Sequence, residues 1–231
     1  FQSTDEVVAL ASVAGKCGGF YASHMRDESA KLIEAIDEAI TIGERSGAKV
    51  EIFHLKAAFR PLAGQLMPKA LERIAAARAR GVDVAADLYP YTAGGTGLDI
   101  TVPNWVFAEG AKAAAEKLKD PAIRARLKRE VAAGSQPGWS NLVEAAGGWG
   151  HVMLANAYDP KMDRYRGQSI AAIGKAVGRD PEDVAWDILL GALPNRAMAL
   201  YFMMDERDVG VALKQPWVSI GTDAGSAVVF G

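Results

Sequence analysis

Residues 18–25, GGFYASHM, and residues 50–57, VEIFHLKA, decide the fold, because each reads as a buried strand with a histidine toward its carboxyl end. Between them, residues 29–47 place apolar side chains on one helical stripe, and Gly47 follows as a helix stop. A strand, a helix and a second strand in this order predict a βα unit with parallel strands.

The same alternation continues along the chain. A helix is predicted at residues 68–81 and a strand at residues 82–91, which run into a loop rich in Gly and Thr. Further strands are predicted at residues 151–157, 197–204 and 217–224, and helices at residues 169–177, 181–193 and 205–215. Alternating strands and helices predict an α/β fold with a parallel sheet.

Residues 97–150 interrupt this rhythm. They contain an amphipathic helix that Asp120 and Pro121 open, among Trp, Gly and Pro residues. A connection this long is usually an elaborated loop over an active site, so we expect a lid-like insertion. A peripheral structural insertion is the alternative. The expected division is therefore residues 1–96 as βα units, 97–150 as the insertion and 151–231 as the remaining βα units of one catalytic domain.

The composition excludes several partners. The chain has 231 residues, 50% of them apolar, and its net charge of −2 gives no electrostatic reason to expect nucleic acid or an anionic membrane. No apolar run approaches the roughly 18 residues of a transmembrane helix. The single cysteine, Cys17, rules out an internal disulfide framework and predicts a reducing, cytoplasmic location.

Three side chains suit a metal centre. His24 and His54 close adjacent predicted strands and are separated by about the length of one βα unit, so a parallel barrel would bring both imidazoles to the same rim. Asp223 follows the last predicted strand and would lie on that rim too. Two imidazoles and a carboxylate suit zinc, although histidines at strand ends often serve packing instead. His151 stands at the start of a strand, on the opposite face, and is interpreted as structural.

Four segments, in order along the chain, carry a more specific signal: GGFYASHMRDES (18–29), EIFHLKAA (51–58), DLYPYTAGGTGL (87–98) and VSIGTDAGS (218–226). Together they resemble the signature segments of the N-acyl-D-amino-acid deacylases, a branch of the amidohydrolase superfamily. The resemblance covers essentially the whole chain. It implies the carboxyl-terminal part of a (β/α)8 barrel of the TIM type, and metal-dependent hydrolysis of N-acyl-D-amino acids to a carboxylate and a free D-amino acid.

The resemblance also implies roles for individual residues. His24 matches the histidine that closes the fifth barrel strand, and His54 matches that of the sixth. Asp223 matches the aspartate after the last strand, with Thr222 and Ala224 where the family usually has Ser and Gly. As a metal-centre residue and catalytic base, Asp223 would take a proton from the attacking water and pass it to the departing amine. One or two zinc ions are implied.

Substrate contacts are predicted beside these ligands. Arg26 and Lys56 each stand two residues after a metal-centre histidine, and alternation along a strand would point them the same way. A cationic pair there suits the α-carboxylate of an N-acyl amino acid. Arg26 pairing with Asp27 or Glu28 as a structural bridge is the alternative. Tyr91 matches a family tyrosine that contacts substrate.

Other parts of the family pattern do not occur in this sequence. The family has a His-x-His pair on the first barrel strand and an upstream metal-binding cysteine, and neither has a counterpart here. We therefore expect this chain to be an incomplete and inactive part of a barrel that missing residues complete. Three alternatives remain: a dihydroorotase-like or hydantoinase-like cyclic amidase, a non-catalytic barrel module, and a partial barrel that another chain completes.

Overall fold

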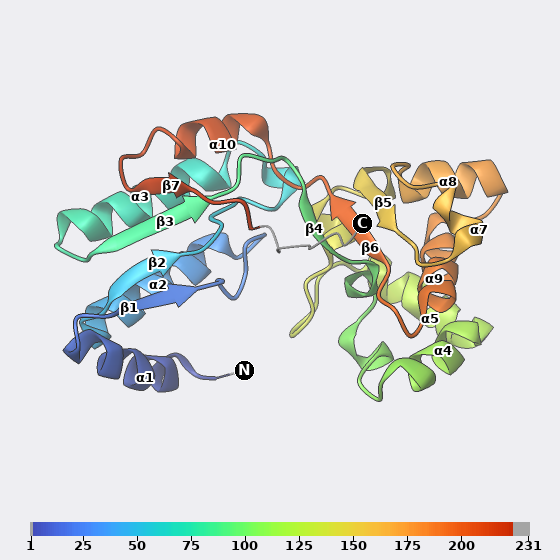
Figure 1. The fold of residues 1–231 in the computed structure, drawn as a ribbon, viewed down its shortest axis with the longest axis horizontal. Coiled ribbons are helices and arrows are strands. Elements are labelled where there is room, and N and C mark those ends of the chain that lie inside the picture. The colour runs from blue at the N-terminus through green and yellow to red at the C-terminus, as the bar shows by residue number, and fades with distance from the viewer. Residues whose placement is uncertain (1, 224–231) are drawn as a thin grey trace, which may run out of the picture. The chain divides into compact units, whose positions relative to one another are not determined.

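The computed structural model describes residues 2–223, which divide into two compact units. Within the described residues, the parallel-sheet unit contains residues 2–58, 62–92 and 204–223. The antiparallel-sheet unit contains Phe59–Pro61 and Ala93–Met203. Each unit is described by itself below, with the element labels of Figure 1.

Four parallel strands form the sheet of the first unit, in the order β1-β2-β3-β7. Their bounds are β1 Phe20–Ser23, β2 Lys49–Ile52, β3 Val84–Leu88 and β7 Val218–Ile220. Because all four run in the same direction, as Figure 1 shows, their carboxyl ends meet at one edge of the sheet. The predicted α/β fold with a parallel sheet is confirmed for this unit.

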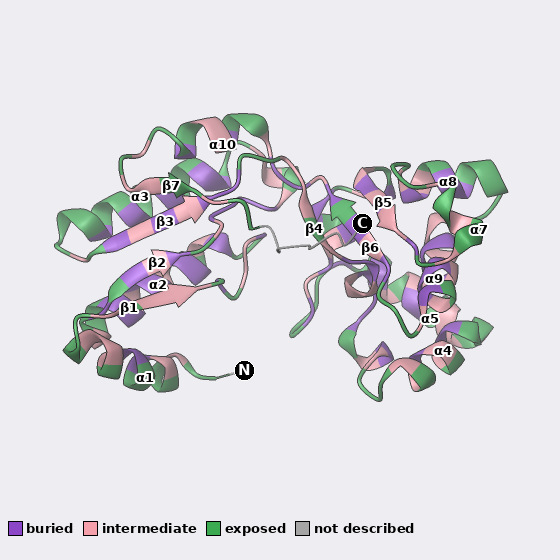
Figure 2. Ribbon diagram, viewed as in Figure 1, coloured by how far each residue is buried: buried purple, intermediate pink, exposed green. Residues whose placement is uncertain are grey.

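The helices of this unit pack each against the next in chain order. They are α1 Thr4–Lys16, α2 Leu32–Ser46, α3 Leu66–Ala79 and α10 Glu206–Ala212. The helix α2 ends where Gly47 adopts a left-handed conformation with φ of 70°, as its sequence predicts. Figure 2 shows α3 buried along one side and exposed along the other, the pattern of a helix that covers a sheet. The helix α2 is buried along one side and mostly intermediate along the other.

The two faces of the sheet differ in chemistry. In β3, Val84, Ala86 and Leu88 are buried, whereas the alternating Asp87 is only partly buried. Glu51 shares the face of Asp87, and burial together with the nearby Asp87 carboxylate raises the pKa of Glu51. The face opposite the helices therefore carries polar side chains close to the strand ends.

The second unit has an antiparallel sheet in the order β4-β6-β5, with bounds β4 Gly94–Gly97, β5 Val152–Asn156 and β6 Met198–Tyr201. Its α-helices are α4 Ala111–Lys119, α5 Pro121–Ala132, α6 Leu142–Ala145, α7 Pro160–Asp163, α8 Ile170–Val177 and α9 Pro181–Ala192. Short 3₁₀ turns occur at Leu98–Thr101, Asn104–Val106 and Trp149–His151. The core of this unit includes the buried rings of Trp139, Trp149 and Trp186.

This unit differs from the expected division of the chain. The sequence predicts barrel strands at residues 151–157 and 197–204. The corresponding strands β5 and β6 instead pair with each other, and β6 also pairs with β4, in a sheet separate from the parallel one. The interruption therefore extends over Ala93–Met203 rather than residues 97–150. Its helix α5 does begin at Pro121, with the Asp120 side chain accepting from two backbone N–H groups, as predicted.

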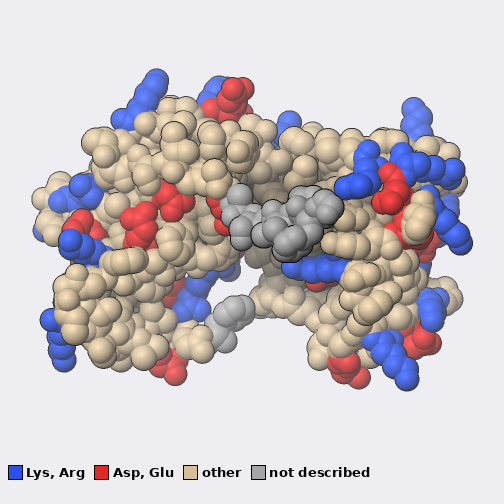
Figure 3. Space-filling view, in the orientation of Figure 1, with Lys and Arg blue, Asp and Glu red and all other residues tan. Residues whose placement is uncertain are grey.

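On the face in Figure 3, basic and acidic side chains are interspersed, in keeping with the small net charge. None of the helices in the described residues is long and apolar enough to cross a membrane.

Candidate metal centre

The carboxyl ends of the parallel strands carry the candidate site. His24 directly follows β1, and His54 stands two residues beyond the end of β2. His54 has a positive φ of 40°, which is unusual for a residue with a side chain. Its backbone N–H donates to Oδ1 of Asp87 in β3 at 2.9 Å, and this bond holds the strained turn in place.

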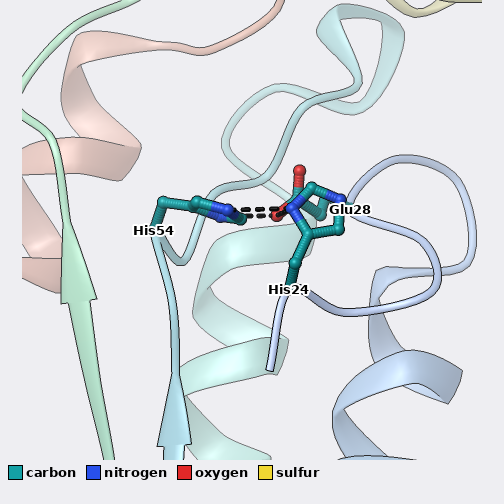
Figure 4. Close-up of side chains that lie close together, drawn as sticks. All are labelled: His24, Glu28 and His54. Atoms are coloured by element: carbon teal, nitrogen blue, oxygen red, sulfur yellow. Dashed lines mark hydrogen bonds and ion pairs between the residues drawn. The ribbon is translucent and has the colours of Figure 1, made fainter. Parts of the chain in front are cut away.

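The two histidine rings meet at this edge, as predicted from their spacing. Nδ1 of His24 lies 2.8 Å from Nε2 of His54, and the rings are nearly perpendicular, at 75°. The surroundings of the two rings differ, since the side chain of His24 is 69% exposed and that of His54 is 11% exposed. His54 is thus the nearly buried ring of the pair and His24 the exposed one, and Figure 4 shows both rings meeting beside Glu28.

Glu28 completes this cluster. Its Oε1 lies 2.8 Å from Nδ1 of His54 and 3.9 Å from Nδ1 of His24. Burial opposes ionisation of the Glu28 carboxyl, but the hydrogen bond from His54 and the charge of Lys56 outweigh it, so its pKa lies below the ordinary value. Glu28 is thus a carboxylate at neutral pH.

Lys56 reaches the same cluster from beyond β2. Its Nζ donates to Oε1 of Glu28 at 2.6 Å and to the carbonyl of His54 at 2.9 Å. Burial lowers the pKa of Lys56, and the charge of Glu28 opposes that shift. The ammonium also lies 5.3 Å from the ring centre of Tyr89, where a cation is attracted to the aromatic face.

Asp223, the predicted catalytic base, lies near this cluster but outside its innermost group. It is exposed, with a φ of 51°. Burial, followed by the negative charges of Glu28 and Asp223, raises the pKa of Tyr89, so its phenol stays protonated at neutral pH. The charge of Asp223 also acts on Lys56 and opposes the lowering of its pKa. Asp223 follows the end of β7 by three residues, at the carboxyl-terminal edge of the parallel sheet.

Arg26 and Tyr91 are placed less directly. Arg26 lines a cavity of about 420 Å³ together with His24, but its Nε donates to Glu38 at 2.6 Å. The bridge partner is thus Glu38, rather than Asp27 or Glu28. Tyr91 is 54% exposed and stacks on Tyr89 with ring centres 6.0 Å apart, while Tyr89 itself is the ring nearer His54, at 6.4 Å.

The donor set suits a divalent metal ion. Ligand atoms of His24, Glu28 and His54 all lie within 4.8 Å of one another. Two imidazole nitrogens and a carboxylate oxygen are ligands that zinc accepts. Asp223 does not join this group of three. An arrangement of this kind is able to bind a metal ion at the sheet edge and to hold a water molecule and a substrate carbonyl beside it.

Two residues of this site were not identified from the sequence. Glu28 was considered only as a partner of Arg26, and Asp87 only as part of a strand. Glu28 follows the strand end by five residues, so its direction depends on a loop whose shape no periodicity predicts. Asp87 precedes the Tyr-Pro-Tyr segment in a strand next to that of His54, and a polar side chain in an otherwise apolar strand was the available signal.

Comparison with known proteins gives this geometry a context. No protein-family model matches the sequence. The chain is 38% identical over 94 residues to a D-aminoacylase of Alcaligenes xylosoxydans xylosoxydans, and 37% identical over 91 residues to an N-acyl-D-glutamate deacylase of the same organism. These alignments cover 41% and 39% of this chain, but only 19% and 18% of the relatives.

Solved structures match nearly the whole chain. An N-acyl-D-glutamate deacylase from Bordetella bronchiseptica, complexed with zinc and a phosphonate inhibitor, has the same fold with a TM-score of 0.65 and 23% identity over 96% of this chain. A D-aminoacylase that defines a subset of the amidohydrolases gives 0.63 and 26% over 96%. A D-aminoacylase with a binuclear metal centre gives 0.61 and 25% over 96%. This chain spans about a third of each, namely 36%, 35% and 35%.

The resemblance inferred from the four sequence segments is therefore confirmed. This chain is homologous to part of the D-aminoacylase and N-acyl-D-glutamate deacylase group, and its fold is that of part of an amidohydrolase.

Proposed function

We propose that this chain contributes part of the active site of a metal-dependent deacylase that hydrolyses the amide bond of N-acyl-D-amino acids. One observation carries the proposal: His24 and His54, from the ends of adjacent parallel strands, point ring nitrogens at each other across 2.8 Å. Homology to deacylases that include a zinc complex supports a metal ion at this position. Because the chain spans only part of those proteins, activity belongs to the whole protein.

In the proposed site, His24 and His54 would hold zinc, and Asp223 would act as the acid–base group at the same edge of the sheet. A bound zinc ion supplies polarisation of the amide carbonyl and a lowered pKa for the attacking water. Asp223 accepts a proton from that water as its oxygen attacks the carbonyl carbon. Asp223 then delivers the proton to the amide nitrogen as the C–N bond breaks, so the products are a carboxylate and a free amine.

Substrate binding is assigned to the cations and the tyrosine near this rim. Lys56 and Arg26 would attract the α-carboxylate of the N-acyl amino acid, and Tyr91 would contact its side chain or acyl group. Each cation already pairs with a glutamate, Lys56 with Glu28 and Arg26 with Glu38. Lys56 is the stronger candidate because its Nζ lies 2.7 Å from Nδ1 of His54. The lid role of the insertion and a cytoplasmic location stay predictions.

The test is hydrolysis by the full-length protein, supplied with zinc, of matched N-acetyl-D-amino acids, N-acetyl-L-amino acids and cyclic amides. We expect release of free D-amino acids that stops after zinc is chelated and returns when zinc is restored. His54→Ala and Asp223→Asn should abolish turnover, while His151→Ala, in the other unit, should not. Cleavage of cyclic amides alone would instead favour a cyclic amidase.

The chain by itself should show little or no turnover, because it contains no His-x-His pair. Assaying the 231-residue chain beside the full-length protein tests this expectation. Equal zinc-dependent activity in the two samples would contradict it.

A further inference from the structure

Asp87 binds two consecutive residues of the turn that carries His54. Its side-chain Oδ1 accepts the backbone N–H of His54 at 2.9 Å, and its backbone carbonyl accepts the N–H of Leu55 at 2.7 Å. Along a regular strand, successive N–H groups point to opposite sides, so only one of these two could reach β3. Strand geometry ends at His54, where a φ of 40° accompanies the turn of both N–H groups toward Asp87.

The same turn sets the direction of the His54 ring. The N–H of Phe53 still donates to the carbonyl of Ser23 in β1, so the chain leaves the strand only at His54. A positive φ at a residue with a side chain persists only where the surrounding structure fixes it. With this backbone, Nε2 of His54 lies 2.8 Å from Nδ1 of His24. The hydrogen bond to Asp87 therefore acts on the ring through the backbone.

A glycine leaves room for the Asp87 carboxylate on the side of β7. Asp87 pairs in register with Ser219, and the N–H of Gly221 donates to the carbonyl of Leu88 at 3.0 Å. A Cβ on Gly221 would lie 3.0 Å from Oδ1 of Asp87 and 3.4 Å from its Cγ, too close for an undisturbed carboxylate. The φ of Gly221 is not positive, so this glycine provides space rather than an unusual backbone conformation. Asp223 follows two residues later.

We propose that Asp87 and Gly221 form a positioning pair. In the space that Gly221 leaves, the Asp87 carboxylate holds the turn of His54 and thereby sets the distance between the rings of His54 and His24. Its use for a metal ion rests on the proposed function, whereas the spacing of the rings concerns only residues of this chain. Ligands of a metal site bind well only when residues around them fix their geometry.

Three substitutions in the 231-residue chain separate the acceptor, its charge and its space. Asp87→Ala removes the acceptor, and Asp87→Asn keeps an acceptor oxygen without the charge. Gly221→Ala adds the methyl group that presses on Oδ1. Asp83→Ala is the matched control, because Asp83 directly precedes β3 and its side chain is 60% exposed.

Nuclear magnetic resonance of the metal-free chain at mildly alkaline pH reports on the turn and on the rings separately. In the unmodified chain, we expect slow hydrogen exchange at the N–H of His54 and a nuclear Overhauser effect between its ring and that of His24, whose centres are 4.6 Å apart. Asp87→Ala should speed this exchange by about 10- to 100-fold, the ratio that corresponds to a lost hydrogen bond to a charged group, and remove the ring contact. Gly221→Ala should act in the same direction more weakly, and Asp87→Asn should keep both signals. The N–H of Phe53 should exchange at an unchanged rate, which a general loss of stability would not allow.

Zinc affinity of the full-length protein, measured by competition with a chromophoric chelator, is the second measurement. We expect Asp87→Ala to weaken zinc binding by about 10-fold or more and Asp87→Asn to weaken it less. Asp83→Ala should match the unmodified protein in both measurements.

Three results would overturn the positioning role. The first is exchange at His54 in Asp87→Ala that is no faster than in the control, and the second is equal acceleration at Phe53 and His54, which would make Asp87 a general stabiliser. The third is a ring contact that persists in both Asp87→Ala and Gly221→Ala. If no form binds zinc while exchange and ring contact change as expected, the proposed function fails and the positioning of His54 by Asp87 stands.

Discussion

Replacing Lys56 by Met should destabilise the parallel-sheet unit strongly, because it leaves Glu28 as a nearly buried carboxylate without its cation. The Lys56 and Glu28 side chains are 10% and 14% exposed, and their charged atoms are 2.6 Å apart. Breaking a buried ion pair from one side costs about 3–5 kcal/mol. The His54 ring still lies beside Glu28, with Nδ1 2.8 Å from Oε1, so we expect the lower end, about 3 kcal/mol.

The assay is urea unfolding followed by far-ultraviolet circular dichroism. With a urea dependence of about 1–3 kcal/mol per molar, a loss of about 3 kcal/mol lowers the unfolding midpoint by about 1 M or more. Arg80→Met is the matched control, because its ion pair with Glu44 is 56% and 41% exposed and should be worth less than about 1 kcal/mol.

A double-mutant cycle separates the ion pair from general packing. Lys56→Met combined with Glu28→Gln removes both charges, so the double variant should be more stable than the sum of the single changes predicts, by about 1–3 kcal/mol. A buried, coupled ion pair is refuted if Lys56→Met costs no more than Arg80→Met, or if the effects of Lys56→Met and Glu28→Gln are additive.

Two further predictions concern packing and acid stability. A Cβ on Gly43 would collide with Cγ2 of the buried Val50, so Gly43→Ala should lower the free energy of unfolding in urea by about 1–3 kcal/mol. Gly210 has open space around it, so Gly210→Ala should cost nothing. Equal effects of the two substitutions would contradict this prediction. Burial opposes ionisation of Asp183, but hydrogen bonds and charge from Lys128 and Arg124 outweigh it, so the pKa of Asp183 in the folded chain lies below 3.8. The stabilisation from this carboxylate is therefore fully present above pH 3.8, and it is lost as the pH falls through the pKa of the folded state. The stability difference between the unmodified chain and Asp183→Asn should therefore be larger at pH 7 than at pH 3, and a difference that stays constant would contradict the assignment.

Local sequence signals predicted most helices and strands of the parallel-sheet unit. Apolar periodicity gave α2, α3 and β1 to β3, and Gly47 marked the end of α2 through its left-handed backbone. The helix α1 was not predicted, although the capping box of Ser3 and Glu6 is a sequence signal for its start. Short apolar runs also identified β5 and β6 as strands. It did not reveal which sheet they join, because strand partners depend on contacts distant in sequence.

The candidate site was predicted in part for a similar reason. Parallel strands bring their ends together, so the spacing of His24 and His54 was informative. Arg26 was placed by extending strand alternation beyond Ser23, where β1 ends, and its side chain instead binds Glu38. Glu28 lies in a loop, and its contacts with His54 and Lys56 follow from the three-dimensional path of that loop.

The most direct test of the metal centre is the zinc affinity of the full-length protein, measured by competition with a chromophoric chelator. We expect zinc binding that His24→Ala and His54→Ala each weaken by at least about 10-fold, and that His151→Ala leaves unchanged. Zinc affinity that is the same in all three variants and the unmodified protein would contradict it.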